Sequence, residues 1–259
     1  MGEIKIIFFD IDGTLIDLDT GRVSQKTLET LKQLKDKSTI LCLATGRSPM
    51  GLPHFDGVEF DAFLTFNGSY CFNRWQTIFS NPIPTEDVKA MIQNAASIHR
   101  PVSIATKKRL IANGTDADLE EYFSFSKLKI VVSDEFEDVA ANDAVYQIML
   151  GCRRDDYPQI LQGTRNAKIA AWWDRAVDVI PADGGKGSGI AKVLSFYHLN
   201  RSAALAFGDG NNDIEMLQAV GHGVAMGNAS KLLKEAADDV CAPVNEDGIY
   251  HYCAGHGLI

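Results

Sequence analysis

The sequence predicts an α/β protein with a doubly wound, Rossmann-like parallel core sheet and an inserted α+β domain. Towards both ends of the chain, short apolar runs that end in Asp, Thr or Gly alternate with helical patterns, as in parallel sheets with crossover helices. Between them, a stretch of about 100 residues holds more strand candidates than helix candidates, which is typical of a separate domain with an antiparallel sheet. At 259 residues, the chain is long enough for one large domain or for two modest domains with their own cores.

The first predicted strand is an apolar run over residues 4–9, which should be buried on both faces. It leads into Asp10 and Asp12 at the carboxyl edge of the sheet, where open α/β sheets bind ligands. On an ideal strand these two carboxylates would share a face and repel each other. A hard cation such as Mg²⁺, which prefers oxygen ligands, would compensate them. A strand-ending turn without further function is the alternative, because Asp and Gly are good turn residues.

A second buried strand over residues 39–44 follows a helix for which Ser24 is the predicted N-cap. This order predicts a right-handed βαβ unit, which places Thr45 beside Asp10. Thr45 offers a hydroxyl, and a helix start after Gly46 would offer backbone N–H groups that suit an anion. A Thr-Gly turn of no consequence is the alternative. A third strand over residues 62–66 and a β-hairpin over 70–79 complete this part of the sheet.

The pattern changes between residues 82 and 181, which we predict to be the inserted α+β domain, whereas residues 1–81 and 182–259 form the core. A helix should begin near Thr85. Trp172 and Trp173 could stack on a substrate, but adjacent residues of a strand face opposite ways, and core packing is the preferred interpretation. Strands are expected over 102–105, 110–112, 129–132, 145–150, 169–173 and 176–180, and helices over 116–123 and 155–161.

The core pattern then returns with a glycine-flanked lysine, Lys186, at the start of an apolar-periodic helix. A lone lysine there is usually a solvated charge, but the surrounding glycines let the backbone approach a ligand closely. A further buried strand over residues 203–207 ends in Gly208-Asp209-Gly210-Asn211-Asn212-Asp213. The sheet that begins before the insertion is therefore expected to be completed after it.

Four segments together resemble the motifs of the haloacid-dehalogenase-like (HAD) superfamily, in its Cof-like branch with a large α/β cap (type IIB). The inserted domain lies between the second and third motifs, so the resemblance covers the whole chain and identifies residues 82–181 with the cap. The motif residues do not depart from the family pattern. The four segments are Asp10-Ile11-Asp12-Gly13-Thr14-Leu15, Ala44-Thr45-Gly46-Arg47, Lys186, and Gly208-Asp209-Gly210-Asn211-Asn212-Asp213.

The resemblance implies roles for the residues of the first and fourth motifs. Asp10 would be the nucleophile that forms an aspartyl-phosphate. The side chain of Asp12 would protonate the leaving oxygen and later deprotonate water. Mg²⁺ would be the cofactor, bound by Asp10, the backbone carbonyl of Asp12, and Asp209. Asp213 would support the metal site without binding the ion.

The resemblance also implies which residues bind the phosphorylated ligand. Thr45 and Gly46 would bind the transferring phosphoryl group. Lys186 would hold the nucleophile and the phosphate together, and Asn212 would contact the substrate. Because attack of a carboxylate on a phosphoryl group brings two anions together, a lysine and a cation at this place make physical sense.

The implied function is that of a magnesium-dependent phosphatase acting on a small phosphorylated metabolite, with a sugar phosphate as the best guess. A phosphomutase of similar cap type would need a bis-phosphorylated activator and a second anion site, for which Lys107, Lys108 and Arg109 form the dense basic cluster. Such a cluster is more often a solvated loop. The third alternative is a phospho-ligand sensor with vestigial catalysis. The intact acid pair, Lys186 and Asp209 argue against a sensor.

The composition of the chain limits the classes of partner that we expect for the protein. The net charge of −9 and the pI of about 5.1 argue against nucleic-acid and membrane-surface binding, which would need basic patches. No apolar run approaches the roughly 18 residues of a membrane span, and the early first strand leaves no room for a signal peptide. Five scattered cysteines without a Cys-x-x-Cys pair suggest reduced thiols. We therefore expect a cytoplasmic protein; its oligomeric state is not indicated.

Overall fold

A computed structural model of the chain describes residues 2–125, 128–171 and 173–259. The described chain divides into two compact units. The first comprises residues 2–46, 52–80 and 185–259, and the second comprises 47–51 and 81–184. Trp172, one of the two tryptophans considered for stacking, lies outside the described residues.

The first unit is built on a sheet with the strand order β13-β12-β11-β1-β2-β3-β4-β5 among its described residues. The strands from β13 to β3 are parallel, whereas β4 is antiparallel to both of its neighbours, β3 and β5. This mainly parallel core sheet confirms the predicted fold class. The strands are β1 Ile6–Phe9, β2 Ile40–Ala44, β3 Ala62–Thr65, β4 Tyr70–Phe72, β5 Thr77–Ser80, β11 Ala204–Gly208, β12 His222–Ala225 and β13 Asp239–Val240.

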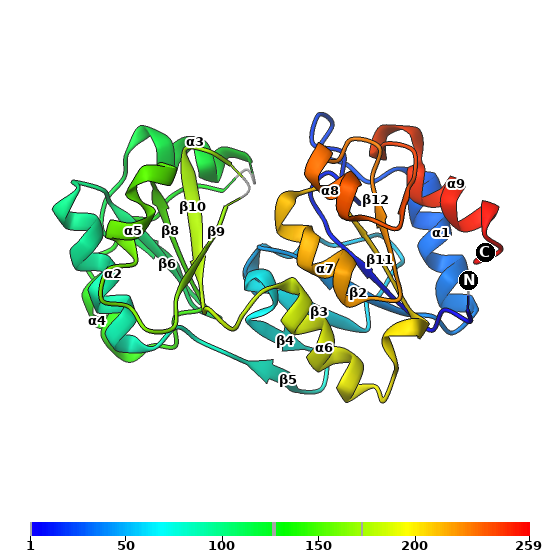
Figure 1. Cartoon of the computed structure of the whole chain (residues 1–259), viewed down its shortest axis with the longest axis horizontal. Helices are drawn as coiled ribbons and strands as arrows, with labels where there is room; N and C mark the ends of the chain where they lie inside the picture. Colours follow the sequence, from blue (N-terminus) through cyan, green and yellow to red (C-terminus); the bar gives the residue numbers. More distant parts are fainter. Residues whose placement is uncertain (1, 126–127, 172) are drawn as a thin grey trace. The chain divides into compact units, whose positions relative to one another are not determined.

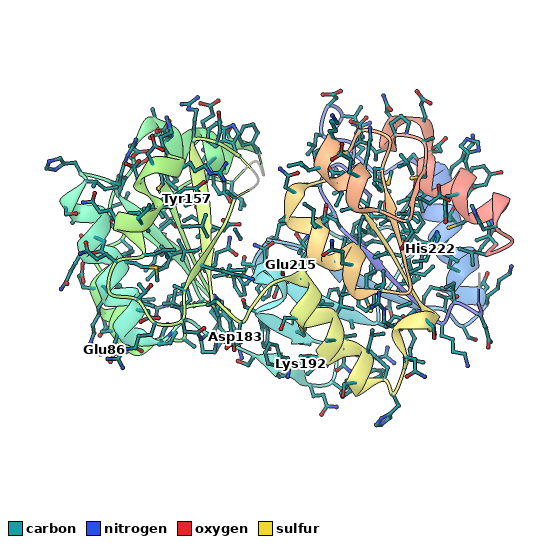
Figure 2. All side chains as sticks on the ribbon, viewed as in Figure 1. Glu86, Tyr157, Asp183, Lys192, Glu215 and His222 are labelled. Carbon is teal, nitrogen blue, oxygen red and sulfur yellow. The ribbon has the colours of Figure 1, made fainter. Side chains whose placement is uncertain are left out.

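Helices cover both faces of this sheet (Figure 1). Helix α1 (Gln25–Asp36) packs beside α9 (Gly248–Gly255), and α6 (Lys186–Phe196) packs beside α7 (Ile214–Ala219), followed by α8 (Lys231–Ala236). The side chain of Ser24 accepts a hydrogen bond from the N–H of Thr27 at 3.0 Å, which confirms Ser24 as the N-cap of α1. Lys192 of α6 lies with its ammonium 5.2 Å from the centre of the Phe79 ring, so α6 also covers β5 (Figure 2).

Strand β1 lies near the middle of the sheet because its sequence, Ile-Ile-Phe-Phe, is apolar on both faces. All four side chains are fully buried. Phe9 stacks on Phe207 of β11 with ring centres 5.5 Å apart, and Phe207 meets the Tyr252 ring of α9 edge-on. Burial of a side chain of this size contributes about 1.5–3 kcal/mol, so the core fixes β1 and the acidic segment that follows it.

The second unit holds an antiparallel sheet with the order β7-β6-β8-β10-β9 in the described part of the chain. Helices α2, α4 and α5 contribute to the core on one face of this sheet. On the other face, the hydroxyl of Tyr122 in α3 donates a 2.5 Å hydrogen bond to Asp178 of β10. The elements are α2 Thr85–Ser97, β6 Val102–Ala105, β7 Leu110–Ala112, α3 Ala117–Phe125, α4 Phe136–Asn142, β8 Gln147–Gly151, α5 Tyr157–Ile160, β9 Lys168–Ala170 and β10 Ala176–Ile180.

Short 3₁₀ helices complete the described secondary structure: Pro49–Gly51, Phe66–Gly68, Arg154–Asp156, Arg201–Ala203, Asn211–Asp213 and Val244–Glu246. None of the helices in the described residues is long and apolar enough to cross a membrane.

Three local predictions were wrong or incomplete. The strand expected over residues 129–132 is only an isolated bridge between Val132 and Ala112, because the segment meets the edge strand β7 at a single point. Helix α4 was missed, although the buried Phe136, Val139 and Ala140 follow helical spacing. The helix start expected after Gly46 is only a three-residue 3₁₀ turn, so any anion cradle there depends on loop amides.

Candidate active site

The site lies at the carboxyl edge of the first unit's sheet, where the strand register brings distant residues together. Phe9, the last residue of β1, pairs with Leu43 of β2 and with Phe207 of β11. Asp10 and Asp209 follow the ends of β1 and β11, and Thr45 follows β2. Parallel strands end at one edge, so the sheet itself brings these three segments together, as the sequence predicted.

Lys186 joins two carboxylates in the buried part of the site. Its Nζ lies 2.6 Å from Oδ1 of Asp10 and 2.5 Å from Oδ1 of Asp213. The Lys186 side chain is fully buried. Burial by itself lowers the pKa of a lysine, but the charges of Asp10 and Asp213 outweigh it and raise the pKa of Lys186 above its ordinary value. The lysine is therefore a fixed positive charge at the proposed nucleophile.

Helix α6 places this lysine because it begins at Lys186 itself. The preceding residue, Gly185, has a φ of 127°, a left-handed conformation that favours glycine. At Gly187, a Cβ would lie 2.6 Å from the carbonyl oxygen of Glu215 in α7 (Figure 2). The glycines on both sides of Lys186 thus allow the turn into α6 and its close packing against α7.

Asp10 is 7% exposed, so its carboxylate lies in an environment that disfavours a negative charge. Burial raises the pKa of Asp10 well above its ordinary value, Lys186 opposes this rise, and the nearby Asp213 and Asp209 add to it. Asp12 lies beyond the end of β1 and is half-buried. Strand β1 stops at Phe9, so the two acids do not share a strand face, contrary to the ideal-strand expectation.

Asp209 is held by the loop that carries the first motif. The hydroxyl of Thr14 donates to its Oδ1 at 3.1 Å. At Gly13, where φ is 82°, a Cβ would lie 2.2 Å from Oδ2 of Asp209, so this close approach requires glycine. Burial, followed by the charge of Asp213, raises the pKa of Asp209 to about 7.

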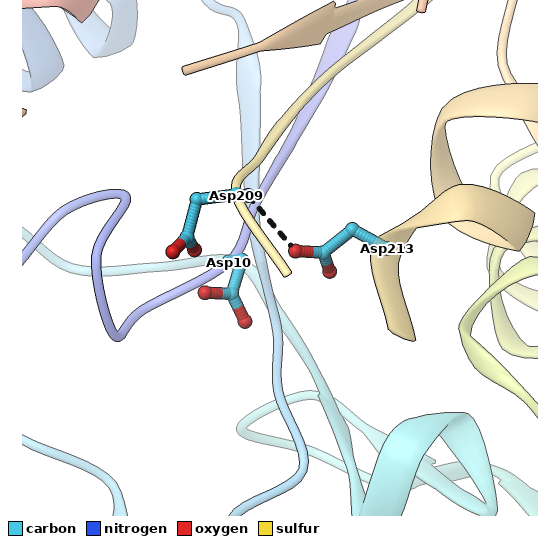
Figure 3. A group of neighbouring side chains, drawn as sticks. All are labelled: Asp10, Asp209 and Asp213. Carbon is cyan, nitrogen blue, oxygen red and sulfur yellow. Dashed lines mark hydrogen bonds between the residues drawn. The ribbon is translucent and has the colours of Figure 1, made fainter. Parts of the chain in front are cut away.

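Asp213 is fully buried and has both carboxylate oxygens engaged. Oδ2 accepts hydrogen bonds from the backbone N–H groups of Asp209 and Gly210, each at 3.0 Å, and Oδ1 accepts from Lys186. Figure 3 shows the Asp209 bond as a dashed line. Asp213 therefore fixes the backbone of the fourth motif and the lysine at once.

The three carboxylates of Asp10, Asp209 and Asp213 form a group that could bind a metal ion. One oxygen from each lies within 4.8 Å of the others (Figure 3). Three acids against one lysine leave excess negative charge, and an all-oxygen donor set suits a hard cation. Because Asp213 is already engaged on both oxygens, Asp10 and Asp209 are the better candidates for direct ligands. The Asp12 side chain is not part of this carboxylate group in the described chain.

The predicted phosphate- and substrate-binding residues also meet at this edge. The Thr45 carbonyl accepts a hydrogen bond from the N–H of Asn67 at 2.9 Å. Nδ2 of Asn212 donates to Oδ1 of Asn67 at 3.2 Å. A Cβ at Gly46 would lie 3.3 Å from Nδ2 of Asn67. The structure thus brings Thr45, Gly46 and Asn212 together around Asn67.

Sequence reasoning missed three residues of this site. Thr14 lies inside the first motif but was given no role. Asn67 follows the predicted third strand, and its position at the carboxyl end of that strand was a usable signal. Asn228 had no local signal, yet its Nδ2 donates to the carbonyl of Gly13 at 2.8 Å and its Oδ1 accepts from the N–H of Val244.

Comparison with known proteins agrees with this geometry. The family of haloacid dehalogenase-like hydrolases matches residues 7–253. The chain therefore belongs to the haloacid dehalogenase-like hydrolases, as its motifs predicted.

Three similar proteins refine this assignment. A Bacillus subtilis (strain 168) protein named "Putative phosphatase YkrA" is 32% identical, and the match covers 99% of both chains. The HAD subclass IIB sugar phosphatase BT4131 is 31% identical, with a TM-score of 0.89 over 98% of this chain and 100% of that one. BT1666 from Bacteroides thetaiotaomicron is 28% identical, with a TM-score of 0.92 over 99% and 96%. The protein is an enzyme of the phosphatase class, with the fold of subclass IIB.

Proposed function

We propose that this enzyme hydrolyses a small phosphorylated metabolite, with a sugar phosphate as the substrate class, in a magnesium-dependent reaction through an aspartyl-phosphate on Asp10. The observation that carries the proposal is the contact of the fully buried Lys186 with Asp10 at 2.6 Å, beside the carboxylate of Asp209. A charge-compensated carboxylate at the edge of a parallel sheet can attack an anionic phosphoryl group.

In the first step, one oxygen of Asp10 forms a bond to phosphorus while the bond from phosphorus to the substrate oxygen breaks. Asp12 donates its proton to that oxygen, which leaves as an alcohol. Lys186 stays protonated and offsets the charge that gathers at the site. Magnesium, held by Asp10, the Asp12 carbonyl and Asp209, would neutralise charge on the phosphoryl oxygens. Asp213 acts indirectly, through Lys186 and the Asp209 backbone.

In the second step, water replaces the Asp10 oxygen on phosphorus. Asp12, now a carboxylate, accepts the proton of that water, and inorganic phosphate is released. Thr45 and Gly46 hold the phosphoryl group through a hydroxyl and backbone N–H groups, and Asn212 contacts the substrate. Phosphoryl transfer needs mainly such positioning and charge stabilisation, which is what these residues can offer.

The substrate class and the domain roles belong to this proposal. The similarity to a sugar phosphatase supports a sugar phosphate. Residues 82–181 would form the cap, and residues 1–81 and 182–259 the catalytic core. The two compact units support this division for most of the chain, with residues 47–51, 81 and 182–184 grouped with the second unit. The five cysteines are free thiols, which suits a reducing compartment such as the cytoplasm.

The phosphomutase alternative gains little support from the segment Lys107–Arg109. Arg109 pairs with Glu135 at 2.8 Å, and the Lys107 ammonium lies 5.6 Å from the centre of the Tyr146 ring. Two of its three cations thus already have partners within the second unit. A phospho-ligand sensor with vestigial catalysis would not need a carboxylate, that of Asp10, whose charge is compensated by Lys186.

A phosphate-release screen tests the proposed function. Purified protein is incubated with magnesium and a panel of phosphorylated metabolites that includes sugar phosphates, nucleotides and phosphorylated cofactor precursors. We expect release from one or more sugar phosphates, lost on chelation and abolished in Asp10→Asn, whose amide is a far poorer nucleophile. The variant should keep the wild-type circular dichroism spectrum. Preference for a substrate without a sugar would contradict the substrate class, and interconversion of isomers without release would indicate a mutase.

A further inference from the structure

The turn that follows β3 has an unusual backbone. Phe66, Asn67 and Gly68 have φ values of 51°, 52° and 86°, all in the left-handed region. Glycine adopts this region freely and asparagine tolerates it, but a bulky side chain such as that of Phe66 is an outlier there. Strained backbone of this kind persists only where the surroundings fix it, and it is frequent at functional sites.

Contacts with the first unit's motif segments fix this turn. The N–H of Asn67 donates to the carbonyl of Thr45 at 2.9 Å. A Cβ on Gly68 would lie 2.5 Å from the carbonyl oxygen of Gly185, the residue before Lys186. The turn therefore lies against both the second motif and the start of the helix that carries the lysine.

The side chain of Asn67 adds a contact with the fourth motif. It is 2% exposed, and its Oδ1 accepts the hydrogen bond from Nδ2 of Asn212 at 3.2 Å. The same amide lies against Gly46, where a Cβ would be 3.3 Å from Nδ2. Because Asn67 is almost fully buried, its side chain contacts neighbouring residues and not solvent. Asn212 is half-buried and can reach a ligand.

We propose that Asn67 is a positioning residue for phosphoryl transfer. Its side chain orients the Asn212 amide, and its backbone N–H fixes the carbonyl of Thr45, so that the second and fourth motifs present one preformed surface to the substrate. This inference rests on the proposed function, because Asn212 and Thr45 contact substrate only if that function is correct.

The residue type follows from two requirements at one position. The left-handed backbone excludes most side chains, and the bond to Asn212 requires an acceptor on a short side chain. Glycine meets the first requirement alone. Aspartate meets both but would place another negative charge beside an anionic substrate. Asparagine meets both without adding charge.

A double-mutant cycle tests the inference. Asn67→Gly keeps a residue that accepts the left-handed turn and removes only the side chain. We expect kcat/KM for the best sugar phosphate to fall roughly 10-fold, the range for a lost hydrogen bond that leaves a polar partner misplaced. Asn212→Ala should lose at least as much. Adding Asn67→Gly to Asn212→Ala should then change kcat/KM by less than about threefold, because the two side chains act as one unit.

The kinetic pattern separates positioning from a general structural effect. Loss of positioning should appear mainly as a higher KM, whereas a smaller folded fraction would lower kcat alone. His198→Gly is the matched control, since His198 has a φ of 56° in the same unit and lies just past the end of α6. This control should keep wild-type kcat and KM, and thermal melts should show both glycine variants to be folded.

Two results would overturn the role of Asn67 alone: a folded, active Asn67→Gly enzyme with wild-type kcat/KM, or effects of the two substitutions that multiply as independent losses. Wild-type protein that releases no phosphate from any phosphorylated metabolite of the panel would instead overturn the proposed function, and the role of Asn67 with it. The wild-type measurement therefore distinguishes the two failures.

Discussion

Asp10 and Asp12 are two residues apart, yet their surroundings differ. Asp10 is 7% exposed and bonded to the buried Lys186, whereas Asp12 is half-buried. The contact with Lys186 opposes the rise in the pKa of Asp10 that burial causes, and it fixes the direction of the carboxylate that would attack. A carboxyl group nearer to solvent can exchange its proton, as an acid and base requires. The division of labour proposed for the two acids thus agrees with where each one lies.

The role of Asp12 can be tested through the leaving group. A sugar alkoxide must be protonated as it leaves, whereas nitrophenolate is stable without help. General-acid assistance is typically worth about 10²–10⁴-fold, so Asp12→Ala should lose something of that order in kcat/KM for a sugar phosphate and much less for nitrophenyl phosphate. The comparison uses kcat/KM because kcat can reflect hydrolysis of an intermediate common to both substrates. An equal fall for the two substrates would remove Asp12 from the role of acid.

At the level of secondary structure, one carboxylate, that of Asp118, links several segments of the second unit. Asp118, in the first turn of α3, accepts hydrogen bonds from Arg100 at 3.1 Å, Arg153 at 3.3 Å and Arg175 at 2.7 Å. These arginines come from the chain segments after α2, after β8 and before β10. Burial acts to raise the pKa of Asp118, but the bonds from Arg153 and Arg175 outweigh it and lower the pKa to about 2.

This arrangement predicts a pH-dependent contribution to stability. Because the folded pKa is depressed, the contribution is complete above the unfolded pKa of about 3.9 and is lost as the pH falls towards the folded pKa. At pH 7, Asp118→Asn should lower the free energy of unfolding by about 2 kcal/mol. Urea denaturation should show this difference shrinking to roughly half near pH 3.

The control for Asp118→Asn is Glu120→Gln. Glu120 is an exposed residue of the same helix, and its carboxylate accepts a hydrogen bond from the Thr115 hydroxyl. This substitution should change stability by less than about 0.5 kcal/mol at either pH. A gap between wild type and Asp118→Asn that stays constant from pH 7 to pH 3 would show that the arginine cluster does not act through the charge of Asp118.

Strands, helix caps and motifs were predicted correctly where the sequence pattern that indicates them lies within one short segment. The apolar run of β1, the Ser24 cap and the acidic or glycine-rich strand ends of the motifs are all local, and each is found where it was expected. The prediction of a strand over residues 129–132 was wrong because a strand there would have to pair with β7, which is distant in the sequence. Asn228 was missed for the same reason: its contact with Gly13 spans 215 positions.

At the scale of the whole molecule, an acidic chain with a net charge of −9 must bind an anionic substrate. The structure offers Lys186 as a buried cation at the centre of the site, and the carboxylate group around it would attract a metal ion. Lys186 alone does not balance the three carboxylates, so the proposed metal ion would have to supply the rest of the local positive charge. Interactions inside a buried site are screened far less than those at the surface, so such local charge would act on the substrate more strongly than the net charge does.

Metal dependence can be measured with and without turnover. Chelation should stop phosphate release, magnesium should restore it, and calcium should substitute poorly because its larger, looser coordination misplaces the attacking oxygen. Magnesium should also raise the melting temperature of wild type through binding to the folded state. Asp209→Asn should lose this rise. Equal rates with both ions, or an unchanged magnesium-dependent rise in Asp209→Asn, would contradict the proposed ligands.

The most direct test of the central claim is to detect the phosphoryl group on Asp10. Asp12→Ala should slow hydrolysis of the intermediate, since the general base is lost, while nitrophenyl phosphate still phosphorylates the enzyme. Acid-quenched protein, digested and measured by mass spectrometry, should carry one phosphoryl group on the peptide that contains Asp10. A burst of nitrophenolate without phosphate on that peptide, or with phosphate on another residue, would contradict the account.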